Sequence, residues 1–112
     1  MNTLELQQLE LSIKQAQQIV NLGESLERLV VNRDFKELIL KGYFEQEAIR
    51  LVHLKCDDNM QSSDSQYSIE KQMMGIGAFS AYLDTVRIRA QMAVNSLASD
   101  EETRNELLEE GI

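Results

Sequence analysis

The sequence predicts an all-α protein, and three observations support this fold class. Its 112 residues contain no proline, which removes the commonest helix breaker. Apolar residues recur every three or four positions through two long stretches, which is the period of an amphipathic helix. Hydrophobic residues make up 43% of the chain and charged residues 27%, which is ordinary for a globular protein. We therefore expect a single helical domain, residues 1–112, built as an elongated bundle with two long antiparallel helices.

The first long helix is expected over about residues 3–32. Its apolar positions form two heptad-like seams, and the second seam begins where the first one ends. The seams are Leu6, Leu9, Ile13, Ala16 and Val20, followed by Ile19, Leu22, Leu26 and Leu29. This offset rotates the apolar stripe, so the helix can touch different neighbours at its two ends. Gly23 costs about 1 kcal/mol relative to alanine inside a helix, and we interpret it as a close approach of another helix or as a bend.

Shorter helices are expected over about residues 35–41 and 44–55. Asp34 is the expected N-cap of the first, because Glu37 follows it three residues later. Gly42 is expected to end that helix as the left-handed residue after its last turn. The alternative is one continuous helix through Gly42, since no Ser, Thr, Asp or Asn follows the glycine to cap a new helix.

The second long helix is expected over about residues 69–98, after a polar loop at 56–66 and with Ser68 as its N-cap. Its stripe consists of Ile69, Met73, Ile76, Phe79, Leu83, Val86, Ala90, Val94 and Leu97. At about 1.5 Å per residue, each long helix is about 45 Å in length, so the two can lie side by side with residues 34–55 as a cross-piece. Ser99 and Glu102 form a capping box for a last helix over about residues 100–110.

Five residues are candidate contacts for a protein partner. Gly77, Ala81 and Thr85 form a stripe of small residues, four positions apart, along the second long helix. Such a stripe lets another helix approach closely, and that helix can belong to the same chain or to another subunit. Tyr43 and Phe44, the adjacent aromatic residues after Gly42, are the other two candidates.

No catalytic, cofactor-binding or metal-binding residue is predicted. His53 and Cys56 are the only histidine and the only cysteine, so carboxylates would have to complete a metal site that needs three or four ligands. Their spacing at a helix end also disfavours nucleophilic catalysis. Glu45 and Glu47 face different sides of a helix. The sequence therefore predicts a protein that is not an enzyme and that carries no cofactor.

The charge balance restricts the class of partner. The net charge is −8, from 19 acidic and 11 basic residues, which argues against binding to nucleic-acid phosphates or to an anionic membrane. Residues 99–112 contribute six acids against Arg104, and these form either a solvated face or a surface for a basic partner. The single cysteine fits a reducing cytoplasm, and the N-terminus has neither the basic start nor the apolar core of a signal peptide.

The stretch from about residue 20 to 56 shows a resemblance. The residues that carry it are Asn32, Asp34–Phe35–Lys36, Gly42–Tyr43–Phe44, Ala48, Arg50 and Leu51. Here the chain resembles small proteins encoded by tailed bacteriophages, some of them among virion-assembly genes. The resemblance covers about a third of the chain and includes no catalytic motif. It implies a viral accessory or structural role, located in the host cytoplasm or in the virion.

Two hypotheses for the function follow. The first is a non-enzymatic phage structural or virion-assembly protein that acts through helix–helix contacts as part of a homo-oligomer. The second is a small acidic inhibitor that binds a basic host protein by mimicking nucleic acid. An apolar contact between copies of charge −8 should tighten as salt rises, whereas a complex based on charge mimicry should weaken.

Overall fold

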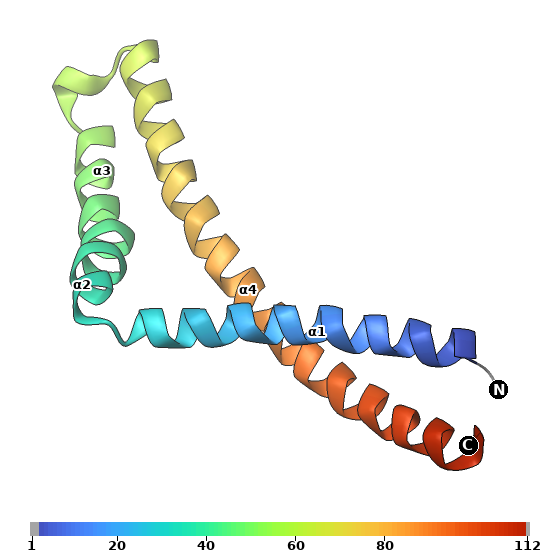
Figure 1. Cartoon of the computed structure of the whole chain (residues 1–112). Coiled ribbons are helices and arrows are strands. Elements are labelled where there is room, and N and C mark those ends of the chain that lie inside the picture. The colour runs from blue at the N-terminus through green and yellow to red at the C-terminus, as the bar shows by residue number, and fades with distance from the viewer. Residues whose placement is uncertain (1–2, 112) are drawn as a thin grey trace. The chain divides into compact units, whose positions relative to one another are not determined.

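The computed structural model describes residues 3–111, and this part of the chain is helical and contains no strand (Figure 1). The all-α prediction is therefore confirmed. The elements are α1 (Thr3–Val30), α2 (Arg33–Phe35), the π-helix η1 (Lys36–Glu47), α3 (Ala48–Lys55), the 3-10 helix η2 (Asp58–Met60) and α4 (Ser63–Gly111). The chain divides into a terminal unit, Met1–Leu26 with Thr85–Ile112, and a central unit, Glu27–Asp84. That the chain forms one domain stays a prediction.

The central unit contains an antiparallel helical hairpin. Its first arm is the helical stretch from α2 through η1 to α3, and the first part of α4 returns beside this arm (Figure 1). Leu51 is fully buried between the arms, and Ile69 and Ile76 of α4 are buried against it. The part-buried residues around these three are Tyr43, Phe44, Ala48, Leu54, Met60 and Met73. Burial of these apolar side chains holds the two arms together.

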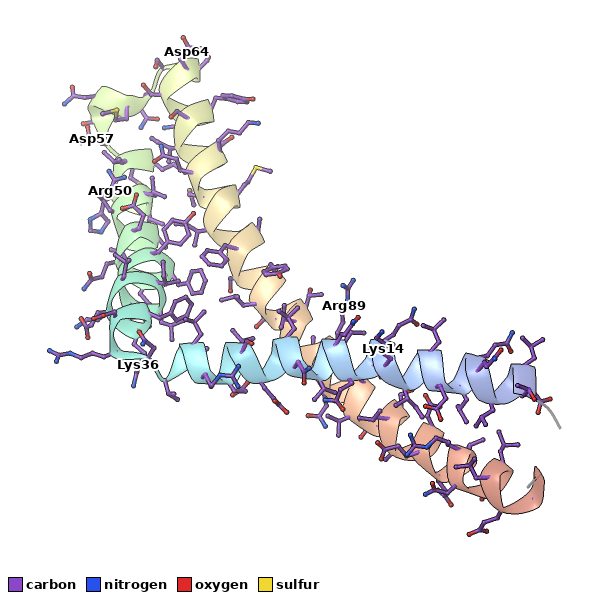
Figure 2. All side chains as sticks on the ribbon, viewed as in Figure 1. Lys14, Lys36, Arg50, Asp57, Asp64 and Arg89 are labelled. Carbon is purple, nitrogen blue, oxygen red and sulfur yellow. The ribbon has the colours of Figure 1, made fainter. Side chains whose placement is uncertain are left out.

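Side-chain hydrogen bonds close the turn of this hairpin. The side-chain amides of Gln61 and Gln66 each donate to the backbone carbonyl of Lys55 at 3.0 Å, which satisfies a carbonyl at the end of α3. The Lys55 ammonium in turn donates to Gln66 Oε1 at 2.9 Å and to Glu70 Oε1 at 2.8 Å. Asp57 and Asp64 lie at the same end of the hairpin (Figure 2). The two arms are therefore tied at the turn by polar contacts as well as by their core.

The terminal unit is an antiparallel pair formed by α1 and the second part of α4. Glu10 lies opposite Arg104 at 3.9 Å, and the Ser12 hydroxyl donates to Asp100 at 3.1 Å. The buried residues of the pair are Ala16, Gly23 and Leu26 on α1 with Val86 and Ala93 on α4. Most of these side chains are small, so the two helix axes can come close together.

The residues that α4 turns toward α1 keep a strict spacing of three and four. They are the buried or half-buried positions Val86, Ala90, Ala93, Leu97, Asp100, Arg104 and Leu107. On α1 the matching positions are Leu6, Leu9, Ile13, Ala16, Val20 and Gly23, which confirms that the first of the two predicted seams packs against another helix. Two seam positions of α4, Asp100 and Arg104, are polar and contact Ser12 and Glu10 of α1, and such polar contacts in a seam favour one register of the two helices.

Gly42 does not end a helix, and the predicted break between residues 41 and 44 is wrong. Helical structure continues from Arg33 to Lys55, and no glycine among the described residues has a positive φ. The N-cap is Asn32 rather than Asp34, because Asn32 is extended and its side-chain oxygen accepts the Phe35 N–H at 3.0 Å. The predicted helix end at a left-handed Gly42 does not form, because the residues after Gly42 stay helical and pack against α4.

The second long helix is longer at both ends than predicted. It begins at Ser63 rather than at residue 69, and Ser62 Oγ accepts the Ser65 N–H at 3.1 Å, so Ser68 is not the cap. The separate helix at 100–110 is also wrong, because α4 runs on to Gly111 and Ser99 lies inside it. The seam toward α1 continues past Ser99, and this tertiary packing outweighs the local capping pattern.

The two long helices do not pair along their whole length as predicted, because α4 contributes to both units. In the terminal unit the second part of α4 pairs with α1, and in the central unit residues 63–84 pair with the arm from α2 to α3. The segment expected as a cross-piece is therefore one arm of a hairpin.

The Gly23 contact generates the first testable prediction. A Cβ at Gly23 would overlap the Cβ of Ala90, whereas a Cβ at Gly77 would meet nothing within 4 Å. Gly23→Ala should therefore lower the free energy of unfolding by about 1–3 kcal/mol, since overpacking outweighs the gain in helix propensity. Gly77→Ala is the matched control and should raise it by about 1 kcal/mol.

Urea unfolding followed by circular dichroism measures both values. Adding Ala90→Gly to Gly23→Ala should restore stability beyond the sum of the single effects, because it removes the overlapping atom. A Gly23→Ala variant as stable as Gly77→Ala would contradict the close approach.

Candidate protein-binding surfaces

Part of the predicted small-residue stripe forms an exposed face of α4 in the central unit. A side chain at Gly77 would project into open space, and Ala78 and Ala81 are exposed. Met74 is 70% exposed at one end of the stripe. We call Met74, Gly77, Ala78 and Ala81 the outer face of α4. Because α4 packs on its hairpin partner through Ile69 and Ile76, this face has no neighbour within the central unit.

The third residue of the predicted stripe, Thr85, belongs to the terminal unit and is half-buried. The exposed apolar residues of α4 in that unit include Ile88 and Met92, which are 59% and 65% exposed. They are four residues apart and so share one side of the helix. The three stripe residues therefore differ in exposure, with Gly77 and Ala81 open to solvent and Thr85 partly covered.

A second exposed face lies on α1. Leu4, Leu11 and Leu22 are 64%, 56% and 51% exposed, and Ile19 is 40% exposed. Ile19 and Leu22 come from the second of the two predicted seams, which is mainly exposed, although Leu26 is buried. We call Leu4, Leu11, Ile19 and Leu22 the outer face of α1. Within the terminal unit α1 has one neighbouring helix, which covers the first seam and leaves this face uncovered.

A shallow hollow of about 370 Å³ lies beside the contact between α1 and α4 in the terminal unit. Its lining residues are Ser12, Gln15, Ala16, Ile19, Arg89, Met92, Ala93 and Ser96. Arg89 is the charged residue of this lining, and Figure 2 labels it on α4. The hollow thus combines exposed apolar side chains with polar groups along one side of the helix pair.

Tyr43 and Phe44 are placed differently from the outer faces. Both are half-buried in the central unit, where they meet Phe79 of α4 with ring centroids 6.1 Å and 5.4 Å apart. The Phe44 and Phe79 rings are edge-on, which is a favourable geometry for an aromatic pair. These two residues therefore contribute to the internal core, and their contact with a partner stays a prediction. The sequence placed Phe79 in the apolar stripe of the second long helix, but it did not predict that Tyr43 and Phe44 would contact this ring.

A second hollow, of about 510 Å³, lies over η1 and is lined by Leu38, Ile39, Gly42, Tyr43 and Glu47. Leu38 is 72% exposed at its edge. The Glu47 carboxylate accepts two hydrogen bonds of 2.7 Å from Arg50. These bonds lower the pKa of Glu47 against a smaller opposing effect of desolvation, and they raise the pKa of Arg50.

The lowered pKa of Glu47 sets the direction of a pH effect on stability. The contribution of this ion pair is present above the ordinary carboxyl pKa and is lost as the pH falls through the lowered pKa of the folded state. The Arg50 side chain is exposed and the Glu47 side chain is partly exposed to solvent, so the contribution is small.

The remaining candidate chemistry is dispersed. His53 and Cys56 are exposed, and residues 3–111 hold no group of three His, Cys, Asp or Glu side chains arranged for a metal ion. Glu45 is exposed, whereas Glu47 is bound to Arg50. In the same part of the chain, no helix is long and apolar enough to cross a membrane.

No protein family model, no curated protein and no solved structure matches this chain. The resemblance of residues 20–56 to bacteriophage proteins therefore stays a prediction. The fold and the exposed faces define the class of the molecule, which is an all-α protein made of antiparallel helix pairs whose outer sides carry apolar residues.

The aromatic cluster generates the second testable prediction. Phe44→Ala should lower the free energy of unfolding by about 2–4 kcal/mol, because it removes a part-buried ring from the central core. Leu38→Ala is the matched control on the same helical segment, and it should change stability by less than about 0.5 kcal/mol because Leu38 is exposed. Both values come from urea unfolding. Equal effects of the two substitutions would show that Phe44 does not belong to the core.

Proposed function

We propose that this chain is a non-enzymatic interaction protein that binds protein partners, its own copies first, through the outer faces of its helices. With the resemblance of residues 20–56, the role that fits best is a structural or virion-assembly protein of a tailed bacteriophage. It would then act in the host cytoplasm or in the virion. It needs no cofactor, nucleic acid or membrane for this role.

The observation that supports the proposal is the outer face of α4. Ala78 and Ala81 with Gly77 leave little side-chain bulk on this side of the helix, so another helix can approach its backbone closely. Met74 adds a flexible apolar side chain that adapts to many surfaces. A helix that is apolar on two opposite sides is normally covered on both. An interaction would cover the side that the hairpin leaves open.

A second copy of the chain is the favoured first partner. Closed symmetric homo-oligomers are the commonest soluble assemblies, and in a two-fold dimer the same face serves both subunits. The small residues of the α4 outer face suit such self-contact, because two faces without bulky side chains fit together. Charge does not drive it, since each copy carries −8. The contact must therefore be mainly apolar, and salt should strengthen it by screening the repulsion.

One observation favours the alternative of an acidic inhibitor. Five of the six acids within residues 99–112 are exposed, namely Glu101, Glu102, Glu106, Glu109 and Glu110. This end of α4 is a continuous helix, so it presents those carboxylates on a rigid support. A basic host protein would bind there through charge, and salt would weaken the complex.

Self-association generates the third testable prediction. In sedimentation at tens of micromolar, the wild type should form a dimer or larger oligomer that becomes tighter as salt is raised. Ala81→Glu should abolish it, because the new carboxylate has to be desolvated in an apolar contact. Gln72→Glu is the matched control. It adds the same charge at another exposed position of α4 and should leave the oligomer intact.

Circular dichroism should show unchanged helix content in both variants, so that loss of association is not confused with unfolding. A wild-type monomer at high salt would refute the proposal. Capture of a basic host protein that dissociates as salt rises would then support the inhibitor instead.

A further inference from the structure

The π-helical segment η1 is unusual for its length. Lys36–Glu47 spans 12 residues, with the ordinary α-helical turns of Arg33–Phe35 before it and Ala48–Lys55 after it. In a π-helix each N–H bonds the carbonyl five residues earlier instead of four. Such geometry is normally confined to a single turn and often lies at functional sites. A stretch of this length needs support from tertiary packing.

The packing that supports η1 comes from adjacent aromatic residues. Tyr43 and Phe44 both reach Phe79 on α4, at centroid distances of 6.1 Å and 5.4 Å. The apolar residues along the arm, Phe35, Ile39, Leu40, Tyr43, Phe44 and Ala48, recur about every four positions. That interval is longer than the 3.6 residues of an α-turn, so a straight α-helix would turn them progressively away from α4. The wider π-turn keeps both ends of the series on the core side.

Gly42 lies in the middle of η1, where an added side chain would be close to the backbone of the preceding turn. A Cβ at this position would lie 3.0 Å from the carbonyl oxygen of Glu37, which is five residues earlier. This contact is tighter than most Cβ contacts, so an alanine here would press on the carbonyl that the π pattern brings close. Its φ is not positive, which excludes the alternative reason for a glycine here. In an α register the same position would favour alanine over glycine.

The outer side of η1 carries an exposed leucine and a hollow. Leu38 is 72% exposed, and beside it lies the hollow of about 510 Å³ that Gly42 and Tyr43 also line. A change of one residue in hydrogen-bond register would rotate the part of the arm before Gly42 by roughly 100° relative to α3. The rotation would move Leu38 and Ile39 relative to α4. Val31 and Asn32, the two residues between α1 and α2, would take up the rotation.

We propose that Lys36–Glu47 is a conformational switch with two hydrogen-bond registers. One is the π register of this structure, in which Tyr43 and Phe44 pack on Phe79 and the hollow is open. The other is an α register with better backbone geometry, in which the first part of the arm is rotated and the hollow changes its lining. The π register is favoured by aromatic packing on Phe79, whereas the α register is favoured by the geometry of its backbone hydrogen bonds. This device stands independently of the proposed self-association.

Through-hydrogen-bond NMR couplings test the switch, because they identify the carbonyl that each N–H bonds. In the wild type, amides of residues 41–47 should couple to carbonyls five residues earlier, and relaxation dispersion should reveal exchange confined to residues 36–47. Gly42→Ala should shift the couplings to carbonyls four residues earlier, abolish the dispersion and raise amide protection in this segment about tenfold. Gly77→Ala is the matched control, a glycine-to-alanine change in open space on α4, and should leave the register unchanged.

Deletion of the exposed Lys41 is a second route to the α register, because it removes one residue from the widened segment. The deletion variant should fold, keep the helix content per residue and show couplings to carbonyls four residues earlier. The proposal is overturned if the wild type shows no dispersion in this segment. It is equally overturned if neither variant gives a folded chain with the α register.

Discussion

α4 is one uninterrupted helix of 49 residues, and both helix pairs of this protein depend on it. Its first part is an arm of the central hairpin, and its second part is half of the terminal pair. Nothing in its sequence forces a stop, since the chain has no proline. Its interior glycines, Gly75 and Gly77, lie within the helix without a positive φ. Continuity of this helix therefore decides which residues each pair can bring together.

The two pairs achieve their contacts in different ways. In the central unit, Leu51, Ile69 and Ile76 are buried, and the aromatic rings of Tyr43 and Phe44 pack beside them and contact Phe79. In the terminal unit, Gly23 against Ala90 shows that the helices approach through small residues. Close approach by small residues buries less apolar area per residue than large side chains do. Much of the apolar surface of α1 and α4 consequently stays outside the pairs, and this surplus is the basis of the proposed partner contacts.

The switch proposed for η1 and the partner contacts proposed for α4 involve opposite sides of the hairpin core. The aromatic cluster connects them, because Phe79 lies on α4 and its two partners lie on η1. A change in the register of η1 would alter what Phe79 contacts. It would leave the outer face of α4, which is on another side of that helix, chemically unchanged. Regulation of self-association by the switch would therefore have to act through the position of α4 in the hairpin.

The sequence by itself determined the helical fold class, the positions of the apolar stripes and the first seam of α1, because helical periodicity is a local property of the chain. It also identified the exposed stripe at Gly77 and Ala81, although it could not say which side of α4 would be covered. Only the tertiary structure decided that helical structure runs through Gly42 and that α4 runs through Ser99. The local pattern favoured a helix end at Gly42 and a new helix start at Ser99, and packing against a distant helix outweighed both. The sequence did not predict the π-helix η1, whose aromatic residues Tyr43 and Phe44 pack on Phe79, more than 30 residues further along the chain.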